Sequence, residues 1–78
     1  GAKALRREKR IAGKPGGLFS VFSYAERTSG VFVEGAKYPL KDAVLTQSYP
    51  IGVHNEFTAE PFVSIRAGFG RLLIVVEK

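Results

Sequence analysis

The 78 residues have a mass of 8.5 kDa, which leaves room for one small domain with a single hydrophobic core. The absence of cysteine and the presence of only one histidine exclude disulfides, a thiol nucleophile and a cysteine- or histidine-based metal site. Hydrophobic residues make up 45% and charged residues 24%, as in globular domains, and the longest wholly apolar run, residues 72–76, is too short to span a membrane. The basic start lacks the apolar stretch of a signal peptide. We therefore expect a folded, cofactor-poor domain with a cytoplasmic location.

The formal net charge of +5 comes from the start of the chain. Residues 1–14 contain six basic residues and one acidic residue (6 − 1 = 5), whereas residues 15–78 contain six of each and sum to zero. A basic arm of this kind binds phosphates through counterion release, which would indicate nucleic acid. We favour the alternative that residues 6–12 are an edge strand or linker whose charges lie in water. We thus expect two parts: residues 1–14, a basic linker or edge-strand arm in which Gly1 and Ala2 resemble a cloning remnant, and residues 15–78, the folded domain.

The first half of that domain is predicted to consist of short strands separated by glycine and proline. Residues 13–17, GKPGG, predict a hairpin turn, since no helix follows that would make them a phosphate loop. Residues 18–25, LFSVFSYA, have apolar side chains on both faces, which suits a strand inside a sandwich or barrel. A second strand is predicted over residues 30–34. The chain is expected to stay extended up to Tyr38, because a residue that precedes proline avoids the helical region.

The second half of the domain is also predicted to consist of short strands separated by turns. Residues 41–45 are the only stretch with some helical character, and they are too short to form a helix without tertiary support. Residues 51–57 alternate as a strand. Residues 62–67 and 71–77 predict a final hairpin, the second run being typical of a central buried strand. Some seven short, mainly antiparallel strands predict an all-β fold, either a small sandwich or a partly open barrel.

The sequence contains no convincing catalytic constellation. A single histidine gives no triad with a clear spacing, and solvation explains the acidic residues more simply than a glycosidase-type pair. Four aromatic residues near the basic arm could form a stacking platform for single-stranded nucleic acid, although a small core also needs such residues. These are Phe19, Phe22, Tyr24 and Phe32. We assign no catalytic residue to the chain.

Two features depart from the strand pattern around them. These are Tyr38 and the polar trio His54, Asn55 and Glu56, which interrupts an otherwise apolar strand. A ligand with an amino-heteroaromatic ring could satisfy the polar groups while Tyr38 offers a stacking face. Two alternatives stay open: His54 as an exposed strand residue, and Asn55 as a satisfied turn or core amide.

Six short segments follow one another across residues 18–76, about three quarters of the chain. They are LFSVFS at 18–23, GAKYPL at 35–40, DAVL at 42–45, GVHNEF at 52–57, FVSIRAG at 62–68 and GRLLIVV at 70–76. In order and spacing the set resembles the C-terminal, vitamin B1 (thiamine) binding domain of thiamin pyrophosphokinases. Members of that family have a serine-rich strand, G-x-K-Y/W-P/N-L, a short apolar stretch, G-x-S-N-E, and V-S-V followed by G-x-L-L-V-V.

The resemblance implies a parent enzyme that transfers diphosphate from ATP to thiamine, makes thiamine diphosphate, needs Mg²⁺ and works as a homodimer. In the family the thiamine pocket lies between the nucleotide domain of one subunit and the β domain of the other. Carried over, Tyr38 matches the aromatic residue beside the thiamine ring, and Gly52 to Asn55 match the strand that lines the pocket. His54 stands where the family commonly has serine, and its protonation would oppose a cationic thiazolium.

The family's ATP and Mg²⁺ residues belong to an N-terminal α/β domain that these 78 residues do not contain. The resemblance therefore implies thiamine binding without catalysis, and no cofactor or metal held by the fragment itself. Two alternatives remain: a small β-barrel that binds nucleic acid through the basic arm, and a structural module whose apolar strand faces pair subunits. The neutral charge of residues 15–78 argues against nucleic acid. No membrane partner is expected.

Overall fold

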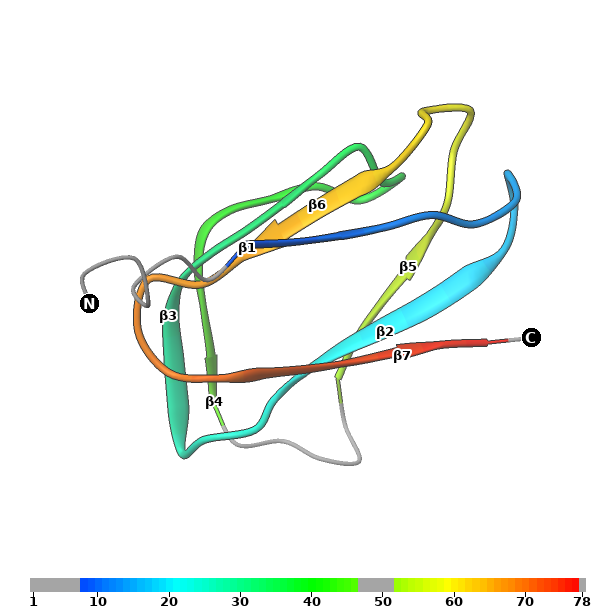
Figure 1. The fold of residues 1–78 in the computed structure, drawn as a ribbon. Coiled ribbons are helices and arrows are strands. Elements are labelled where there is room, and N and C mark those ends of the chain that lie inside the picture. Colours follow the sequence, from blue (N-terminus) through cyan, green and yellow to red (C-terminus); the bar gives the residue numbers. More distant parts are fainter. Residues whose placement is uncertain (1–7, 47–51, 78) are drawn as a thin grey trace.

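The computed structural model describes residues 8–46 and 52–77, and these form seven strands in two sheets (Figure 1). The strands are β1 (Glu8–Ile11), β2 (Leu18–Ser23), β3 (Arg27–Glu34), β4 (Leu40–Thr46), β5 (Val53–Glu56), β6 (Val63–Arg66) and β7 (Leu72–Val76). The strand order is β1-β6-β3-β4 in one sheet and β5-β2-β7 in the other, with antiparallel pairing throughout. The predicted all-β class is confirmed, as a small sandwich of two open sheets.

The core lies between the inner faces of the two sheets. It is a cluster of buried apolar side chains from both sheets: Phe19, Val21, Val33, Phe57, Val63 and Ile65. Successive side chains of a strand point to opposite faces, so each strand supplies every second residue to this layer. The rings of Phe19 and Phe57 pack with their centroids 4.8 Å apart and their planes tilted by 43°, a favourable aromatic geometry.

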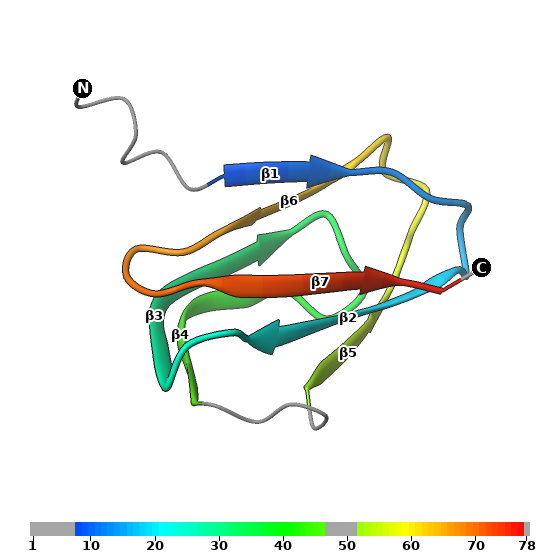
Figure 2. The ribbon, with the colours of Figure 1, turned by 60° about the horizontal axis from the view of Figure 1, so that its bottom comes forward.

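Strand β2 has apolar side chains on both faces, as the sequence predicts. It lies in the middle of its sheet, between β5 and β7 (Figure 2). Phe19 faces the core and is fully buried, while Phe22, on the opposite face, is also buried with 7% of its surface exposed. The burial of both residues agrees with their predicted role in filling a small interior.

Consecutive strands mostly lie in different sheets, and two predicted hairpins are therefore wrong. Residues 13–17 connect β1 to β2 across the sandwich, and the connection after β6 passes from one sheet to the other before β7 begins. Of the consecutive strands in the described residues, only β3 and β4 pair with each other. Glycine and proline mark where the chain turns, but they do not determine which strand becomes the neighbour.

Strand β7 is an edge strand, not the central strand that its apolar run predicts. It pairs with β2 alone, and Val75 and Val76 keep 42% and 43% of their surfaces exposed. Apolar side chains on both faces of a strand indicate that other parts of the protein cover both faces. They do not indicate whether a second strand pairs with it at each edge.

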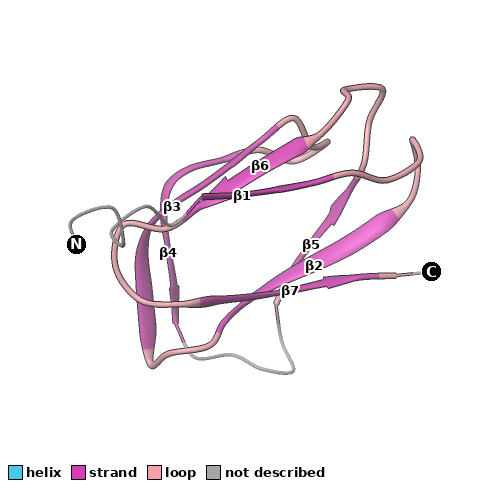
Figure 3. Cartoon of the chain, in the orientation of Figure 1, coloured by secondary structure: helices cyan, strands magenta, loops and turns pink. Residues whose placement is uncertain are grey.

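Residues 41–45 form most of β4, so their weak helical tendency is not realised. Pairing with β3 determines their conformation, although the register between the two strands has two irregularities. Asp42 has a φ of 52°, in the left-handed region that Asp tolerates better than most residues. Figure 3 shows the described chain as strands and loops only, and none of it forms a helix of the length and apolarity that a membrane crossing requires.

The described part of the basic arm, residues 8–14, begins with edge strand β1, whose charged side chains are exposed. The guanidinium of Arg10 lies 4.7 Å from the ring centroid of Phe62, and Ser64 donates a hydrogen bond of 2.7 Å to Glu8. These contacts hold β1 against β6. Residues 1–7, which contain much of the predicted basic charge, lie outside the described residues.

Candidate functional site

The segment that contains Tyr38 runs along the edge of β5. Ala36 and Phe57 form an isolated antiparallel bridge, and the Lys37 amide donates a hydrogen bond of 3.0 Å to the carbonyl of Glu56. Gly35 begins the segment with a φ of 90°, and a Cβ there would lie 2.7 Å from the carbonyl oxygen of Phe62, so the turn requires glycine. Instead of staying extended, the chain bends at residues 35–38.

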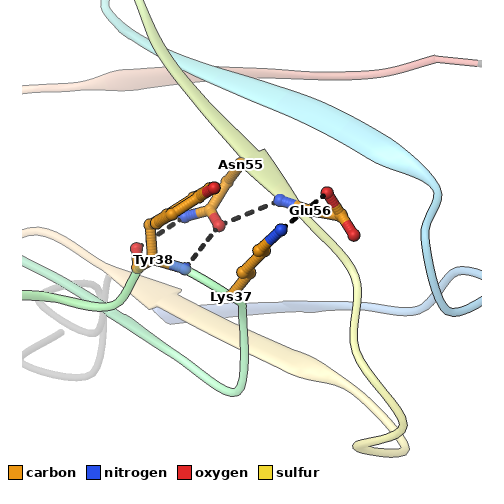
Figure 4. Close-up of polar contacts among 4 residues, drawn as sticks. All are labelled: Lys37, Tyr38, Asn55 and Glu56. Carbon is orange, nitrogen blue, oxygen red and sulfur yellow. Dashed lines mark hydrogen bonds and ion pairs between the residues drawn. The ribbon is translucent and has the colours of Figure 1, made fainter.

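Asn55 holds this segment to β5 by hydrogen bonds to both polar groups of the Tyr38 main chain (Figure 4). Its Oδ1 accepts from the Tyr38 amide at 2.9 Å, and its Nδ2 donates to the Tyr38 carbonyl at 2.7 Å. The same Oδ1 accepts from the amide of Glu56 at 2.9 Å. Asn55 is only 2% exposed, so its side of these partly buried bonds is shielded from water. Asn55 is a satisfied amide that also fixes the position of Tyr38.

The side chain of Tyr38 is available to a ligand, with 55% of its surface exposed. The ammonium of Lys37 lies 5.4 Å from the Tyr38 ring centroid and 3.7 Å from the Glu56 carboxylate. The Glu56 carboxylate, with a further contribution from Tyr38, raises the pKa of Lys37 above its usual 10.5. The arrangement offers an aromatic face flanked by a cation and an anion (Figure 4).

His54 lies on the face of β5 opposite to the Asn55 side chain, because neighbouring strand residues alternate. It is exposed, and its Nδ1 lies 2.8 Å from the hydroxyl of Ser20, its partner across the strand pair. The alternation puts Glu56 on this same face. The structure thus brings Tyr38 together with Asn55 and leaves His54 on the other face of the strand.

Gly52 has a packing role in the strand that was predicted to line the pocket. A Cβ at this position would lie 2.4 Å from Cδ1 of the Phe22 ring and 2.8 Å from the carbonyl oxygen of Val21. Only a residue without a side chain lets the chain pass under Phe22 here. The structure therefore gives Gly52 a steric function whether or not a ligand binds.

The sequence analysis singled out Glu56 within the polar trio but assigned no part to Lys37. Lys37 lies beside Tyr38 in the sequence, and that adjacency was the only signal available for it. Hollows of about 300 Å³ and 720 Å³ lie elsewhere, against β7 and at the loops before β3 and β7. Tyr38 lines neither of these two hollows. No cluster of three or more His, Asp or Glu side chains suited to a metal ion is found in the described residues.

The four aromatic residues considered for nucleic-acid stacking do not share a surface. Phe19 is buried in the core, and Phe22 lies on the other face of the same strand. The guanidinium of Arg66 covers the ring of Phe32 at 3.9 Å from the centroid. Tyr24 alone is widely exposed, at 67%. A stacking platform needs several open rings along one groove, and this arrangement does not provide one.

The topology defines the protein as an all-β sandwich in which the segment with exposed Tyr38 is anchored on the edge of a three-stranded sheet. No family model matches the chain, and no significant match is found among curated proteins. Among the solved structures that share its fold are two thiamin pyrophosphokinases. Thiamin pyrophosphokinase from Geobacillus thermodenitrificans has a TM-score of 0.81 and 16% identity, over 95% of this chain and 34% of that one. Thiamine pyrophosphokinase from Bacillus subtilis has a TM-score of 0.77 and 19% identity, over 94% and 34%.

The chain therefore spans about a third of the length of the solved structures it matches. At these identities the likeness is one of fold. The predicted resemblance to the C-terminal domain of thiamin pyrophosphokinases is confirmed at that level: the chain has the fold of that domain.

Proposed function

We propose that this chain is the thiamine-binding β domain of a thiamin pyrophosphokinase-like enzyme. The observation that supports the proposal most strongly is the pair of hydrogen bonds by which buried Asn55 holds the main chain of exposed Tyr38. Through these bonds a buried amide fixes the main chain that bears an exposed aromatic ring. This arrangement is well suited to presenting a ring to a planar ligand.

Tyr38 is the residue that would contact the ligand. Its ring is open to stacking on an aminopyrimidine or on the cationic thiazolium of thiamine. The ammonium of Lys37 now lies near this ring, so a cationic ligand would have to displace it. The Glu56 carboxylate, 3.7 Å from that ammonium, would then offer the ligand a negative charge.

Asn55 and Gly52 act as positioning residues in this proposal. Asn55 sets the place of Tyr38, and Gly52 lets β5 approach Phe22. His54 shares a face of β5 with Glu56, so a ligand that reaches the Glu56 carboxylate lies on the same face of the strand as His54. The proposal gives His54 a part only through that contact.

Catalysis belongs, in this proposal, to a part of the parent enzyme that these residues do not include. Diphosphoryl transfer requires groups that position ATP and stabilise phosphate charge. The described residues bring together no acidic cluster that suits Mg²⁺. When bound, Mg²⁺ would neutralise phosphate charge in that other domain. We propose that the chain holds the acceptor, thiamine, and that a partner subunit completes the open site in a homodimer.

Isothermal titration calorimetry with thiamine tests the proposal on the 78-residue chain. Because a partner would supply part of the pocket, we expect a dissociation constant on the order of 1 mM. Tyr38→Ala should abolish the binding heat and Tyr38→Phe should keep it. Tyr24→Ala removes a tyrosine of comparable exposure, 67% against 55%, and serves as the matched control. Binding that survives Tyr38→Ala, or that Tyr24→Ala weakens equally, would contradict the proposal.

A further inference from the structure

Of the two hollows in the surface, the smaller is a groove between β1 and β7, and the larger has a volume of about 720 Å³. The larger hollow lies where the connection from β2 to β3 meets the connection from β6 to β7, at the left of Figure 2. The first connection enters β3 at Arg27, whereas Tyr38 follows the other end of that strand. The strand has eight residues and a length of roughly 20 Å, so the larger hollow is separate from the candidate site around Tyr38.

Two buried hydroxyl groups join the walls of the larger hollow. Ser23 and Thr28 are 1% and 0% exposed, and their side-chain oxygens lie 2.8 Å apart. Thr28 Oγ1 also donates to the Arg71 carbonyl at 2.8 Å and accepts from the Arg71 amide at 3.1 Å. Polar contacts that are removed from water hold their groups firmly in place. The two connections therefore keep one arrangement relative to each other.

Glycine at position 70 lets the two connections come this close. Gly70 has a φ of 102°, and a Cβ there would lie 2.6 Å from Thr28 Oγ1 and 2.7 Å from the Arg27 carbonyl oxygen. Both of these atoms belong to the start of β3. Beside Gly70, the main chain of Phe69 exchanges hydrogen bonds of 2.9 and 3.1 Å with that of Ser29. The main chain on both sides of Gly70 is thus fixed to β3.

This rigid frame presents one aromatic ring and two guanidinium groups to the larger hollow. The ring is that of Phe69, whose exposed fraction of 72% is the highest among the large apolar side chains of the described residues. The guanidinium groups are those of Arg27 and Arg71, which are also exposed. Within residues 8–46 and 52–77, neither arginine takes part in an ion pair or a cation–π contact. An open ring and two such arginines suit a ligand that is both flat and negatively charged.

We propose that the larger hollow binds a small planar oxyanion, an aromatic ring that carries a phosphate or a carboxylate group. The ring would stack on Phe69, and the oxyanion would accept hydrogen bonds from Arg27 and Arg71. The planar guanidinium fork fits phosphate and carboxylate alike. Glu26 also lines the hollow, so the ionised side chains of the lining sum to +1 (2 − 1) and the Glu26 carboxylate opposes the anion. The inference is independent of thiamine, which is a cation.

A titration of the ¹⁵N-labelled 78-residue chain with phenyl phosphate, followed in NMR spectra, tests the proposal. We expect saturable shifts at Arg27, Phe69 and Arg71, with a dissociation constant on the order of 1 mM. Inorganic phosphate lacks the ring and benzyl alcohol lacks the charge, so each should bind at least about fivefold more weakly. Equal binding of either compound would contradict the proposal, and so would shifts centred on Tyr38.

Benzoate distinguishes the two oxyanions that the arginines could accept. Tighter binding of phenyl phosphate than of benzoate would assign a phosphate-bearing ligand, and the reverse order would assign a carboxylate-bearing one. Either order supports a site for a planar oxyanion. No saturable shift with either compound would overturn the proposal.

Substitutions separate the ring from the charge. Phe69→Ala should weaken the binding of phenyl phosphate about fivefold and leave that of inorganic phosphate unchanged. Arg71→Gln should weaken both about tenfold, and Glu26→Gln should strengthen both because it removes the opposing carboxylate. Lys41→Gln removes an exposed positive charge on β4 and is the matched control, which should change neither. If Lys41→Gln had the effect of Arg71→Gln, or if binding survived both Phe69→Ala and Arg71→Gln, the proposal would be wrong.

Discussion

Asn55 and Tyr38, 17 residues apart in the sequence, are joined by two hydrogen bonds between one side chain and one main chain. The contact fixes the main chain of Tyr38 relative to β5, and no atom of the Tyr38 ring takes part in it. Changes at Asn55 should therefore affect ligand binding through the position of Tyr38 and affect stability at the same time. Changes to the Tyr38 ring should affect binding alone.

Asn55→Asp keeps the acceptor but removes the donor that bonds to the Tyr38 carbonyl. At neutral pH it places a buried carboxylate oxygen against that carbonyl. We expect the free energy of unfolding to fall by about 2 kcal/mol, measured by urea denaturation. Burial should raise the folded-state pKa of the new carboxyl above the unfolded value of about 3.9. Stability should therefore be regained as the pH falls toward that value.

Ser64→Ala is the control for this variant, since it also removes one side-chain hydrogen bond but at an exposed site. Its free energy of unfolding should change by less than about 0.5 kcal/mol. Equal losses in Asn55→Asp and Ser64→Ala would show that the bonds of Asn55 are no more important than an ordinary surface contact.

Gly52→Ala should destabilise the chain through overpacking. The added Cβ would lie 2.4 Å from the Phe22 ring, so either the ring or the strand must move. We expect a loss of about 1–3 kcal/mol in thermal or urea unfolding. Gly68→Ala is the matched control, because its nearest contacts of 3.6 Å are ordinary van der Waals distances. If the two variants were equally stable, the packing explanation for Gly52 would fail.

Glu56→Gln should lower the pKa of Lys37 toward 10.5, since the Glu56 carboxylate is the main cause of its elevation. A lysine whose pKa is raised by folding contributes stability below its unfolded pKa and loses that contribution as the pH rises through the folded value. The small contribution of this exposed pair should thus vanish in strongly alkaline solution. A titration of the Lys37 side chain by NMR measures the shift, with Lys41 as a lysine outside the pair. An unchanged Lys37 pKa in Glu56→Gln would contradict the assigned cause.

The parts of the fold that could be predicted are those encoded locally. Period-two alternation identifies β2 and β5, and the apolar residues on both faces of residues 18–25 correctly place Phe19 and Phe22 inside. The strand partners are not encoded in this way. β1 pairs with β6, which lies at the other end of the chain, and no feature of residues 8–11 specifies that partner.

In the candidate site, too, the locally encoded features could be predicted and the contacts between distant segments could not. Tyr38 and Asn55 departed from the strand pattern around them, and this departure was sufficient to single them out. The direction of Asn55 was not predictable, because it depends on the bend at residues 35–38 that brings the Tyr38 main chain within reach. The position of His54 on the opposite face of β5 follows from alternation once its neighbour Asn55 is known to be buried.

The most direct measurement is a titration of the ¹⁵N-labelled chain with thiamine, followed residue by residue in NMR spectra. We expect the largest shifts at Lys37, Tyr38, Asn55 and Glu56, with small shifts on β1 and β6. Shifts centred on the groove between β1 and β7, or no shifts at millimolar thiamine, would contradict the claim that Tyr38, held by Asn55, is where this domain receives its ligand.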